Sequence, residues 1–320
     1  MKMQKILDGI KRPLFERFEV RKSAAQKAAF ADWACEYAKE LGYTPQMEES
    51  GKWLKTRNIV FGDLTKARTL MTAHYDTCAR MPFGNTYTPA CWPIIALTQF
   101  VLPLVLFLAL GFLSGFASAK LVSEFGLSSG MSALLSMLMS FGLAGMVVGL
   151  MLFGPANPHT ANDNTSGVAM VLLAMHLFKG RDDVAFVLFD NEEVGLLGTS
   201  AFVKAHASLS RRALVLNFDC ISDGDTLLLA GNKIVMNGLQ GKKIVSVLEE
   251  TAAQYGKKGS SGIAPKVLYP SDQLLFRRGA AFAALKGKRI LYMDRIHSAK
   301  DTVFDDSNLL CLAEVLEKAI

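Results

Sequence analysis

The sequence lacks several patterns that mark common protein classes. Its five cysteines are scattered, odd in number and never spaced as CxxC, which argues against a disulfide framework. The net charge of +6 comes without a basic stripe interleaved with aromatic residues, so nucleic acid is not an expected partner. The first twenty residues contain no apolar core of signal-peptide length, and we therefore expect the chain to begin in the cytoplasm. No internal repeat is evident.

Charge is missing altogether from two long stretches, residues 94–116 and 131–153, each of 23 positions. At 1.5 Å per helical residue, each would reach about 34 Å, enough to cross a hydrocarbon layer of about 30 Å. Gly111 with Gly115, and Gly145 with Gly149, form small-xxx-small pairs that allow two helices to approach closely. The sequence predicts a transmembrane hairpin over residues 94–153, joined by a short translocated loop over 117–130. The alternative is a buried hairpin or a hydrophobic lid in a soluble enzyme.

A hairpin returns the chain to the side of the membrane that it left. Residues 1–22 carry seven Lys and Arg against three Asp and Glu, and basic residues before a first span favour a cytoplasmic location. We therefore expect residues 1–93 and 154–320 to form a single domain that faces the cytoplasm. The hairpin is then an insertion that anchors the protein in the bilayer, with a face available for homo-oligomers.

The remaining sequence alternates between strand and helix patterns. Helical patterns cover residues 14–41, 168–180, 195–206, 239–255, 272–279 and 306–319, and strand patterns cover 57–62, 67–77, 184–193, 213–219, 226–230 and 289–292. Alternation of this kind predicts an α/β fold with a mostly parallel central sheet and helices on both faces.

Histidines and carboxylates fall at the ends of predicted strands or the starts of helices. They are His74, Asp76, Asp163, Glu192, Glu193, Asp219 and His297. In an open parallel sheet, ligands bind at the carboxyl ends of the strands, so these side chains can converge on one crevice. A set of nitrogen and oxygen donors without cysteine suits zinc with open positions for water.

Six segments of the sequence occur in the same order as in a known enzyme family: "AHYDT", "NDNTSG", "FDNEEVGLLGTSAF", "NFDCIS", "SDQLLF" and "HSAKDT". In these the chain resembles the dinuclear-zinc aminopeptidases of the bacterial leucyl aminopeptidase and aminopeptidase Y type, a family that also includes glutaminyl cyclases. The resemblance covers roughly residues 14–320 apart from 85–155, and it implies a three-layer zinc-exopeptidase fold.

The resemblance also implies roles for single residues. Asp163 would bridge two Zn²⁺ ions, with His74 and Asp219 completing one site and Glu193 and His297 the other. Glu192 would be the general base that acts on a metal-bridged water. Asp76 would orient the ligand His74 from behind, as carboxylates commonly do for zinc-binding histidines.

Each residue has an ordinary structural alternative. His74 with Asp76 could form a surface ion pair, Asp163 could cap the helix after it, and Asp219 could belong to a turn. Glu192 and Glu193 could be a solvated helix start. Cys78 and Cys220 flank the candidate site, but nothing marks either as a nucleophile.

These observations favour a membrane-anchored zinc aminopeptidase that acts on peptides with a free amino terminus. One alternative is a glutaminyl cyclase-like acyltransferase with a single zinc, and another is a non-catalytic membrane scaffold that retains the fold. Gln273 stands where many relatives have His, which leaves substrate choice open. Arg277 and Arg278 are the candidates for holding a substrate carboxylate, as a carboxypeptidase would require.

Overall fold

The computed structural model describes residues 2–52, 54–81, 86–126 and 128–320, in which the chain forms two compact units. The first, called the α/β unit, consists of Met1–Ala90 and Ala156–Ile320. The second, called the hairpin unit, is Cys91–Pro155. The insertion expected over 94–153 thus lies inside the segment that separates out as the hairpin unit.

The α/β unit is built on a mixed sheet, eight-stranded over the described residues, in the order β1-β2-β4-β3-β5-β8-β6-β7. The strands are β1 (Gln46–Ser50), β2 (Thr56–Phe61), β3 (Thr69–His74), β4 (Val184–Phe189), β5 (Leu214–Phe218), β6 (Thr226–Gly231), β7 (Lys258–Ile263) and β8 (Gly279–Leu285). The four central strands β4, β3, β5 and β8 are mutually parallel, whereas β1 with β2, β2 with β4, and β6 with β8 pair antiparallel. The expected α/β class is confirmed, and its parallel strands form the centre of the sheet.

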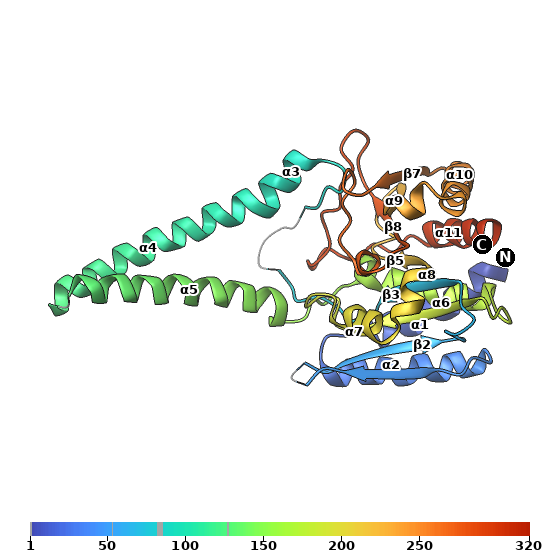
Figure 1. Ribbon diagram of the computed structural model, residues 1–320, viewed down its shortest axis with the longest axis horizontal. Helices are drawn as coiled ribbons and strands as arrows, with labels where there is room; N and C mark the ends of the chain where they lie inside the picture. The colour runs from blue at the N-terminus through green and yellow to red at the C-terminus, as the bar shows by residue number, and fades with distance from the viewer. Residues whose placement is uncertain (1, 53, 82–85, 127) are drawn as a thin grey trace. The chain divides into compact units, whose positions relative to one another are not determined.

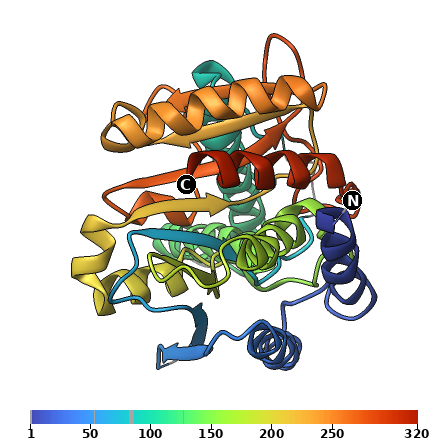
Figure 2. The ribbon, with the colours of Figure 1, turned by 90° about the vertical axis from the view of Figure 1, so that its right-hand side faces the viewer.

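Helices cover both faces of this sheet (Figure 1). The helices of the unit are α1 (Lys2–Glu16), α2 (Ala24–Glu40), α6 (Gly167–Leu177), α7 (Leu197–Ala205), α8 (Ala207–Arg212), α9 (Lys233–Met236), α10 (Leu239–Gln254) and α11 (Asp306–Ala319), with a π-helical turn η2 (Ala161–Ser166) and a 3₁₀ turn η3 (Asp272–Leu275). On one face, α10, α11, α6 and α1 pack side by side, as Figure 2 shows. Helices α7 and α8 contribute to the core on the other face.

Strand β4 illustrates how the pattern of the sequence builds these layers. Its whole length is buried, and alternate residues belong to two different cores. Phe186 and Leu188 join the core under α1, α2, α6, α10 and α11, whereas Val187 and Phe189 join the core under α7 and α8. A strand buried on both faces is continuously apolar, which is why this segment was recognisable from its sequence.

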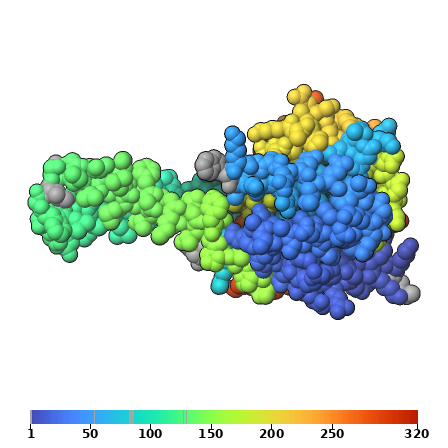
Figure 3. All heavy atoms as spheres, turned by 90° about the horizontal axis from the view of Figure 1, so that it is seen from below, coloured from blue at the N-terminus to red at the C-terminus, as the bar shows by residue number. Residues whose placement is uncertain are grey.

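The N-terminal helical pattern over 14–41 was expected as one helix, and this prediction is wrong. Helix α1 ends at Glu16, and α2 begins after Ser23, whose side chain accepts a hydrogen bond from the Gln26 N–H in a capping box. The capping box starts a new helix, and residues 17–23 form a non-helical connection between α1 and α2. Figure 3 shows the face of this unit on which the N-terminal segment lies, in dark blue.

Two further expectations fail near the C-terminus. The helix expected over 272–279 is only the short turn η3, and the chain then enters the buried strand β8. The strand expected over 289–292 is replaced by isolated bridges, Lys286 with Tyr292 and Tyr87 with Met293. β8 is rich in alanine, a strong helix former, but its place between β5 and β6 overrides that local preference.

The hairpin unit contains α3 (Trp92–Ala96), a π-helical turn η1 (Leu97–Val101), α4 (Leu102–Phe125) and α5 (Ser129–Phe153). The loop expected over 117–130 is mostly helical, because α4 continues to Gly126, which caps it with a left-handed φ of 65°. Trp92–Phe125 and Gly130–Phe153 are long and apolar enough to span a membrane by length and composition, and few of their residues are buried.

Small and hydroxylated residues line the contact between α4 and α5. The Ser114 and Ser140 hydroxyls lie 2.5 Å apart, and a Cβ placed on Gly115 would come within 3.5 Å of the Ser136 hydroxyl. At Gly145 and Gly149, in contrast, no described residue would come within 4 Å of an added Cβ. Only the first of the two expected glycine pairs therefore faces the other helix.

Candidate metal centre and active site

The site is built where the central parallel strands end. His74 is the last residue of β3, and it lies beside Phe189, the last residue of β4. Asp219 follows β5 directly, and Glu192 and Glu193 come soon after β4. The parallel strands end at one edge, so these residues from distant parts of the sequence meet there.

Asp163 lies between the two histidines. Its Oδ1 is 3.5 Å from Nε2 of His74, and its Oδ2 is 3.0 Å from Nε2 of His297. A second carboxylate accompanies each histidine: Asp219 Oδ1 is 3.6 Å from His74 Nε2, and Glu193 Oε2 is 3.3 Å from His297 Nε2. We call His74, Asp163 and Asp219 the His74 subsite, and His297, Asp163 and Glu193 the His297 subsite.

Two buried carboxylate oxygens indicate that these side chains are arranged to bind a cation. Asp219 Oδ1 and Glu193 Oε1 are buried and have no hydrogen-bond partner among the described residues. Unsatisfied buried acceptors are unfavourable, by about 1–3 kcal/mol or more when they are charged. Imidazole and carboxylate donors within 4.8 Å of one another in both subsites fit zinc, which would satisfy both oxygens. The residues therefore fit a zinc centre.

Asp76 holds the two glutamates as well as the histidine. Its carboxylate accepts hydrogen bonds from the backbone N–H groups of Glu192, at 3.0 Å, and Glu193, at 3.2 Å. His74 Nδ1 lies 3.1 Å from the backbone carbonyl of Asp76 and 3.7 Å from its carboxylate. Burial alone would raise the pKa of Asp76, but its interactions with His74 hold that pKa below the usual range. The side chain expected to orient one ligand thus also positions the loop that carries Glu192.

The loop that carries Asp163 is fixed from two sides. Asp301, fully buried, accepts hydrogen bonds from the backbone N–H groups of Asn162, at 2.8 Å, and Asp163, at 2.9 Å. A Cβ on Gly167, which begins α6, would lie 2.2 Å from the Phe218 carbonyl. Only glycine allows α6 to approach the end of β5 so closely, and this contact places Asp163 next to Asp219.

A comparison with known protein families decides the affiliation of the chain. The model of peptidase family M28 matches residues 147–316, more than half of the sequence. The chain belongs to peptidase family M28. The match includes Asp163, Glu192, Glu193, Asp219 and His297. It stops short of His74 and Asp76, which the fold brings to the same place.

Solved structures with a similar fold include proteins named as a glutaminyl cyclase and as exopeptidases. Glutaminyl cyclase from Porphyromonas gingivalis shares 16% identity, with a TM-score of 0.61 over 99% of this chain and 96% of that one. A leucine aminopeptidase precursor from Bacteroides thetaiotaomicron shares 13% identity (TM-score 0.58, 99% and 96% covered). A Zn-dependent exopeptidase from Parabacteroides distasonis shares 15% identity (TM-score 0.58, 98% and 96% covered). Among curated proteins, no sequence matches this chain significantly.

The electrostatics of this M28 site reflect its crowded carboxylates. Burial raises the pKa of Glu193 to about 8 and the pKa of Glu192 well above its usual range, and neighbouring carboxylates add to both effects. Burial opposes the charge on His297, but Glu193 and Asp163 outweigh it and raise the pKa of His297 to about 9. So much negative charge in a buried place is the environment that a bound cation stabilises.

Two buried residues near the site were not assigned from the sequence. Arg21 is fully buried, and its guanidinium donates to the Tyr75 carbonyl and the Thr165 hydroxyl beside the metal-ligand candidates. Asp272, also fully buried, accepts a hydrogen bond from Thr199, and burial raises its pKa to about 7. Asp272 lies in the quoted segment "SDQLLF", which is a usable signal, whereas no local pattern marks Arg21 as buried.

Gln273, the departure from the family pattern, is also buried. Its Nε2 donates to the Tyr269 carbonyl at 2.6 Å, and its Oε1 accepts from Asn217 at 3.4 Å. Tyr269 in turn donates to the carbonyl of Asp219. Gln273 therefore supports the His74 subsite through Tyr269.

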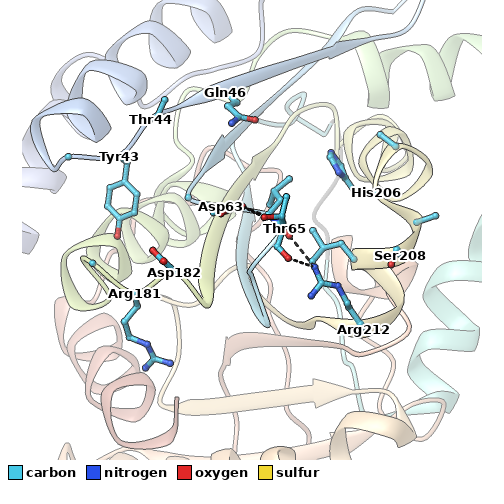
Figure 4. A pocket seen from close by; sticks show the side chains of 17 residues that line it. Tyr43, Thr44, Gln46, Asp63, Thr65, Arg181, Asp182, His206, Ser208 and Arg212 are labelled. Atoms are coloured by element: carbon cyan, nitrogen blue, oxygen red, sulfur yellow. Dashed lines mark hydrogen bonds between the residues drawn. The ribbon is translucent and has the colours of Figure 1, made fainter.

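A cavity of about 750 Å³ lies elsewhere in the α/β unit (Figure 4). It is lined by residues that precede β4 and follow β2, at the opposite end of the strands from the metal-ligand candidates. Its charged groups already have partners: Arg212 donates to the carbonyls of Leu64, Thr65 and Ala67, and His206 contacts Glu48. We therefore place the chemistry at the carboxyl ends of the strands.

Proposed function

We propose that this M28 protein is a membrane-anchored zinc aminopeptidase that removes residues from the amino end of peptides. The observation that supports it most strongly is the position of Asp163, whose two oxygens face two different histidines, each with its own second carboxylate. The His74 and His297 subsites would hold two Zn²⁺ ions. Zinc in such a site makes a bound water acidic and polarises the carbonyl that is attacked.

Glu192 is the proposed general base. It groups with His74 and Glu193 within 4.8 Å, and it belongs to neither ligand subsite. Its raised pKa suits a group that accepts a proton from the attacking water and then passes it to the leaving amine. Asp76 keeps the backbone of Glu192 in place during both transfers.

The positions of Arg277 and Arg278 favour action at the amino end. Both precede β8, which runs parallel to β5, so they lie near the amino ends of the strands rather than near Asp219. Arg278 donates to the Arg212 carbonyl at 2.9 Å. Neither arginine is therefore suited to hold a substrate carboxylate at the site, as a carboxypeptidase needs.

The test is a Glu192→Gln variant of the zinc-loaded full chain in detergent, with Glu49→Gln as a matched control on exposed strand β1. The substrates are aminoacyl-anilides, amino-blocked peptides and peptides with an amino-terminal Gln. We expect turnover that needs a free amine, stops on chelation, falls about 10²–10⁴-fold in Glu192→Gln and is unchanged in Glu49→Gln. Unchanged turnover in Glu192→Gln would show the mechanism to be wrong.

A glutaminyl cyclase is the second candidate, because a structure with this fold carries that name. Cyclisation of the Gln peptide without hydrolysis of the anilides, and with one zinc per chain, would decide for it. If neither reaction occurs in zinc-loaded protein, the third hypothesis, a membrane scaffold that retains the fold, gains support.

We further propose that the hairpin unit spans the bilayer and that the α/β unit faces the cytoplasm. Phe112 and Phe116 are 77% and 70% exposed, which is unfavourable in water and favourable in lipid. Helix α4 also carries Lys120 and Glu124 near its end, so that end would project beyond the hydrocarbon layer. A reporter inserted at Gly126 should be translocated, whereas a cytoplasmic reporter would contradict a spanning hairpin.

A further inference from the structure

Cys78 lies in the wall of the His297 subsite. Its Sγ and the donor atoms of Asp163, Glu193 and His297 all lie within 4.8 Å of one another. Cys78 is 1% exposed, and the Glu193 side chain is 8% exposed, with no hydrogen-bond partner for its Oε1 in the part of the chain that the structure describes. Four potential donors therefore surround one point, and one of them still has an unsatisfied buried oxygen.

The backbone holds Cys78 in this position independently of any ligand. Its carbonyl accepts the Asn157 N–H at 3.1 Å, and the next residue, Ala79, forms a β-bridge with Ala156. A few residues later, the Met81 N–H donates to the carbonyl of His297 at 2.9 Å. The segment that carries Cys78 is thus fixed to the segments that deliver Asp163 and His297.

We propose that Cys78 is a fourth protein ligand, which binds the zinc of the His297 subsite as a thiolate. On binding, the S–H bond breaks, the proton leaves to solvent, and the sulfur donates the freed electron pair to the metal. The inference rests on the proposed zinc centre, and it does not depend on which reaction the enzyme catalyses.

A thiolate makes the two subsites different. With four protein donors, the His297 subsite would leave its metal no position for water. The His74 subsite, with three donors, would keep one, so the attacking water would be bound on the His74 side rather than shared between the metals. Glu192 groups with His74, so the proposed base stands beside the open subsite. Chemistry is then centred on the His74 side, and the His297 side holds its metal more firmly.

Charge and donor softness agree with this assignment. The carboxylates of Asp163, Glu193 and Asp219 with one thiolate carry four negative charges, which equals the charge of two divalent cations. A thiolate also favours zinc over magnesium, calcium or manganese, which prefer oxygen ligands. The His297 subsite should therefore select zinc more strictly than the His74 subsite.

The test replaces zinc with Co²⁺ in the full-length protein and records the near-ultraviolet thiolate-to-cobalt charge-transfer band. The variants are Cys78→Ser and Cys78→Ala. The control is Cys220→Ser, because Cys220 is equally buried and follows Asp219 but belongs to no donor group among the described residues. We expect the band in the parent and in Cys220→Ser, and its loss in both Cys78 variants.

Metal affinity gives a second measurement. In a chelator competition, one equivalent of zinc should bind at least about tenfold more weakly to the Cys78 variants than to Cys220→Ser. A parent that binds Co²⁺ without the band, or a band that survives in both Cys78 variants, would overturn the assignment of Cys78. Protein that binds no metal at all would overturn the zinc centre together with it, so the two failures are distinguishable.

Discussion

Arg21 offers a stringent test of how the site is supported. Its side chain is 0% exposed, and its guanidinium donates to the Tyr75 carbonyl at 2.5 Å, to the Thr165 hydroxyl at 3.1 Å and to the Phe18 carbonyl. Burial lowers the pKa of Arg21 to about 10, against the opposing effect of Asp76, so the group remains charged at neutral pH. We expect Arg21→Met to destabilise the α/β unit strongly.

The magnitude follows from the groups that lose their donor. Two buried carbonyls, those of Tyr75 and Phe18, would each lose a charge-assisted hydrogen bond, at about 1–3 kcal/mol each. With each carbonyl taken at the middle of that range, the sum is about 4 kcal/mol. For a unit of this size, the midpoint of thermal unfolding should fall by about 10 °C. Arg21→Lys keeps the charge but not the planar fork, and roughly half of the loss should remain.

The assay is urea unfolding of the full chain in detergent, followed by the fluorescence of Trp33. This residue packs against Phe18 with ring centroids 5.2 Å apart, and the two other tryptophans of the sequence, Trp53 and Trp92, are replaced by Phe. Arg17→Met is the matched control, because Arg17 is exposed and such changes usually alter stability by about 0.5 kcal/mol or less. A loss below about 1 kcal/mol in Arg21→Met, equal to that of the control, would refute the reasoning.

Three further predictions concern the metal, its support and acid stability. Zinc added to metal-free protein at 100 times its dissociation constant should stabilise the α/β unit by about 2.7 kcal/mol, and no shift of the unfolding midpoint would contradict a metal centre. Asp76→Asn should weaken zinc binding about 10–100-fold in a chelator competition, because an amide cannot accept both N–H groups of the Glu192 loop; unchanged affinity would show that Asp76 plays no such part. Asp305 caps α11 and contacts Lys257 at 2.6 Å, and these interactions lower its pKa although burial opposes them. Its contribution is present above pH 4 and is lost as the pH falls through the lowered pKa, so Asp305→Ala should cost about 1 kcal/mol at pH 7 and progressively less below pH 4, whereas a penalty independent of pH would contradict this.

The parts of the fold that could be predicted from sequence were those whose patterns are local. The continuous apolar run of β4 and the uncharged stretches in α4 and α5 can be recognised directly in the sequence. A strand buried on both faces, and a helix long enough to cross a hydrocarbon layer, each require consecutive apolar residues. The edge strands β1 and β7 went unnoticed, since their sequences, "QMEES" and "KGSSGI", carry no apolar pattern and pair only because a neighbour is present. β8 was not predicted from the sequence either: its alanine-rich segment carries no strand pattern, and the helix expected just before it, over 272–279, is only the short turn η3.

For the site, the sequence by itself determined the kinds of donors and their order along the chain. His74, Asp163, Asp219 and His297 follow predicted strands or open a helix, and the ends of parallel strands must meet at one edge. The tertiary structure alone decided which atoms face each other. In the folded chain, the two oxygens of Asp163 face different histidines. The Asp76 carboxylate accepts hydrogen bonds from backbone N–H groups that lie 116 and 117 residues away in the sequence.

Arg21 and Cys78 show where the limit lies. Nothing next to Arg21 in the sequence requires burial, yet the break between α1 and α2 brings it within 3.1 Å of Thr165, 144 residues away. Cys78 lies four residues after His74 in the sequence. It becomes a candidate ligand only because the fold brings Asp163, Glu193 and His297 next to it from three other segments. Residue type and spacing set the chemistry that is available, whereas contacts between distant segments depend on how the whole sheet closes, and only the folded chain specifies them.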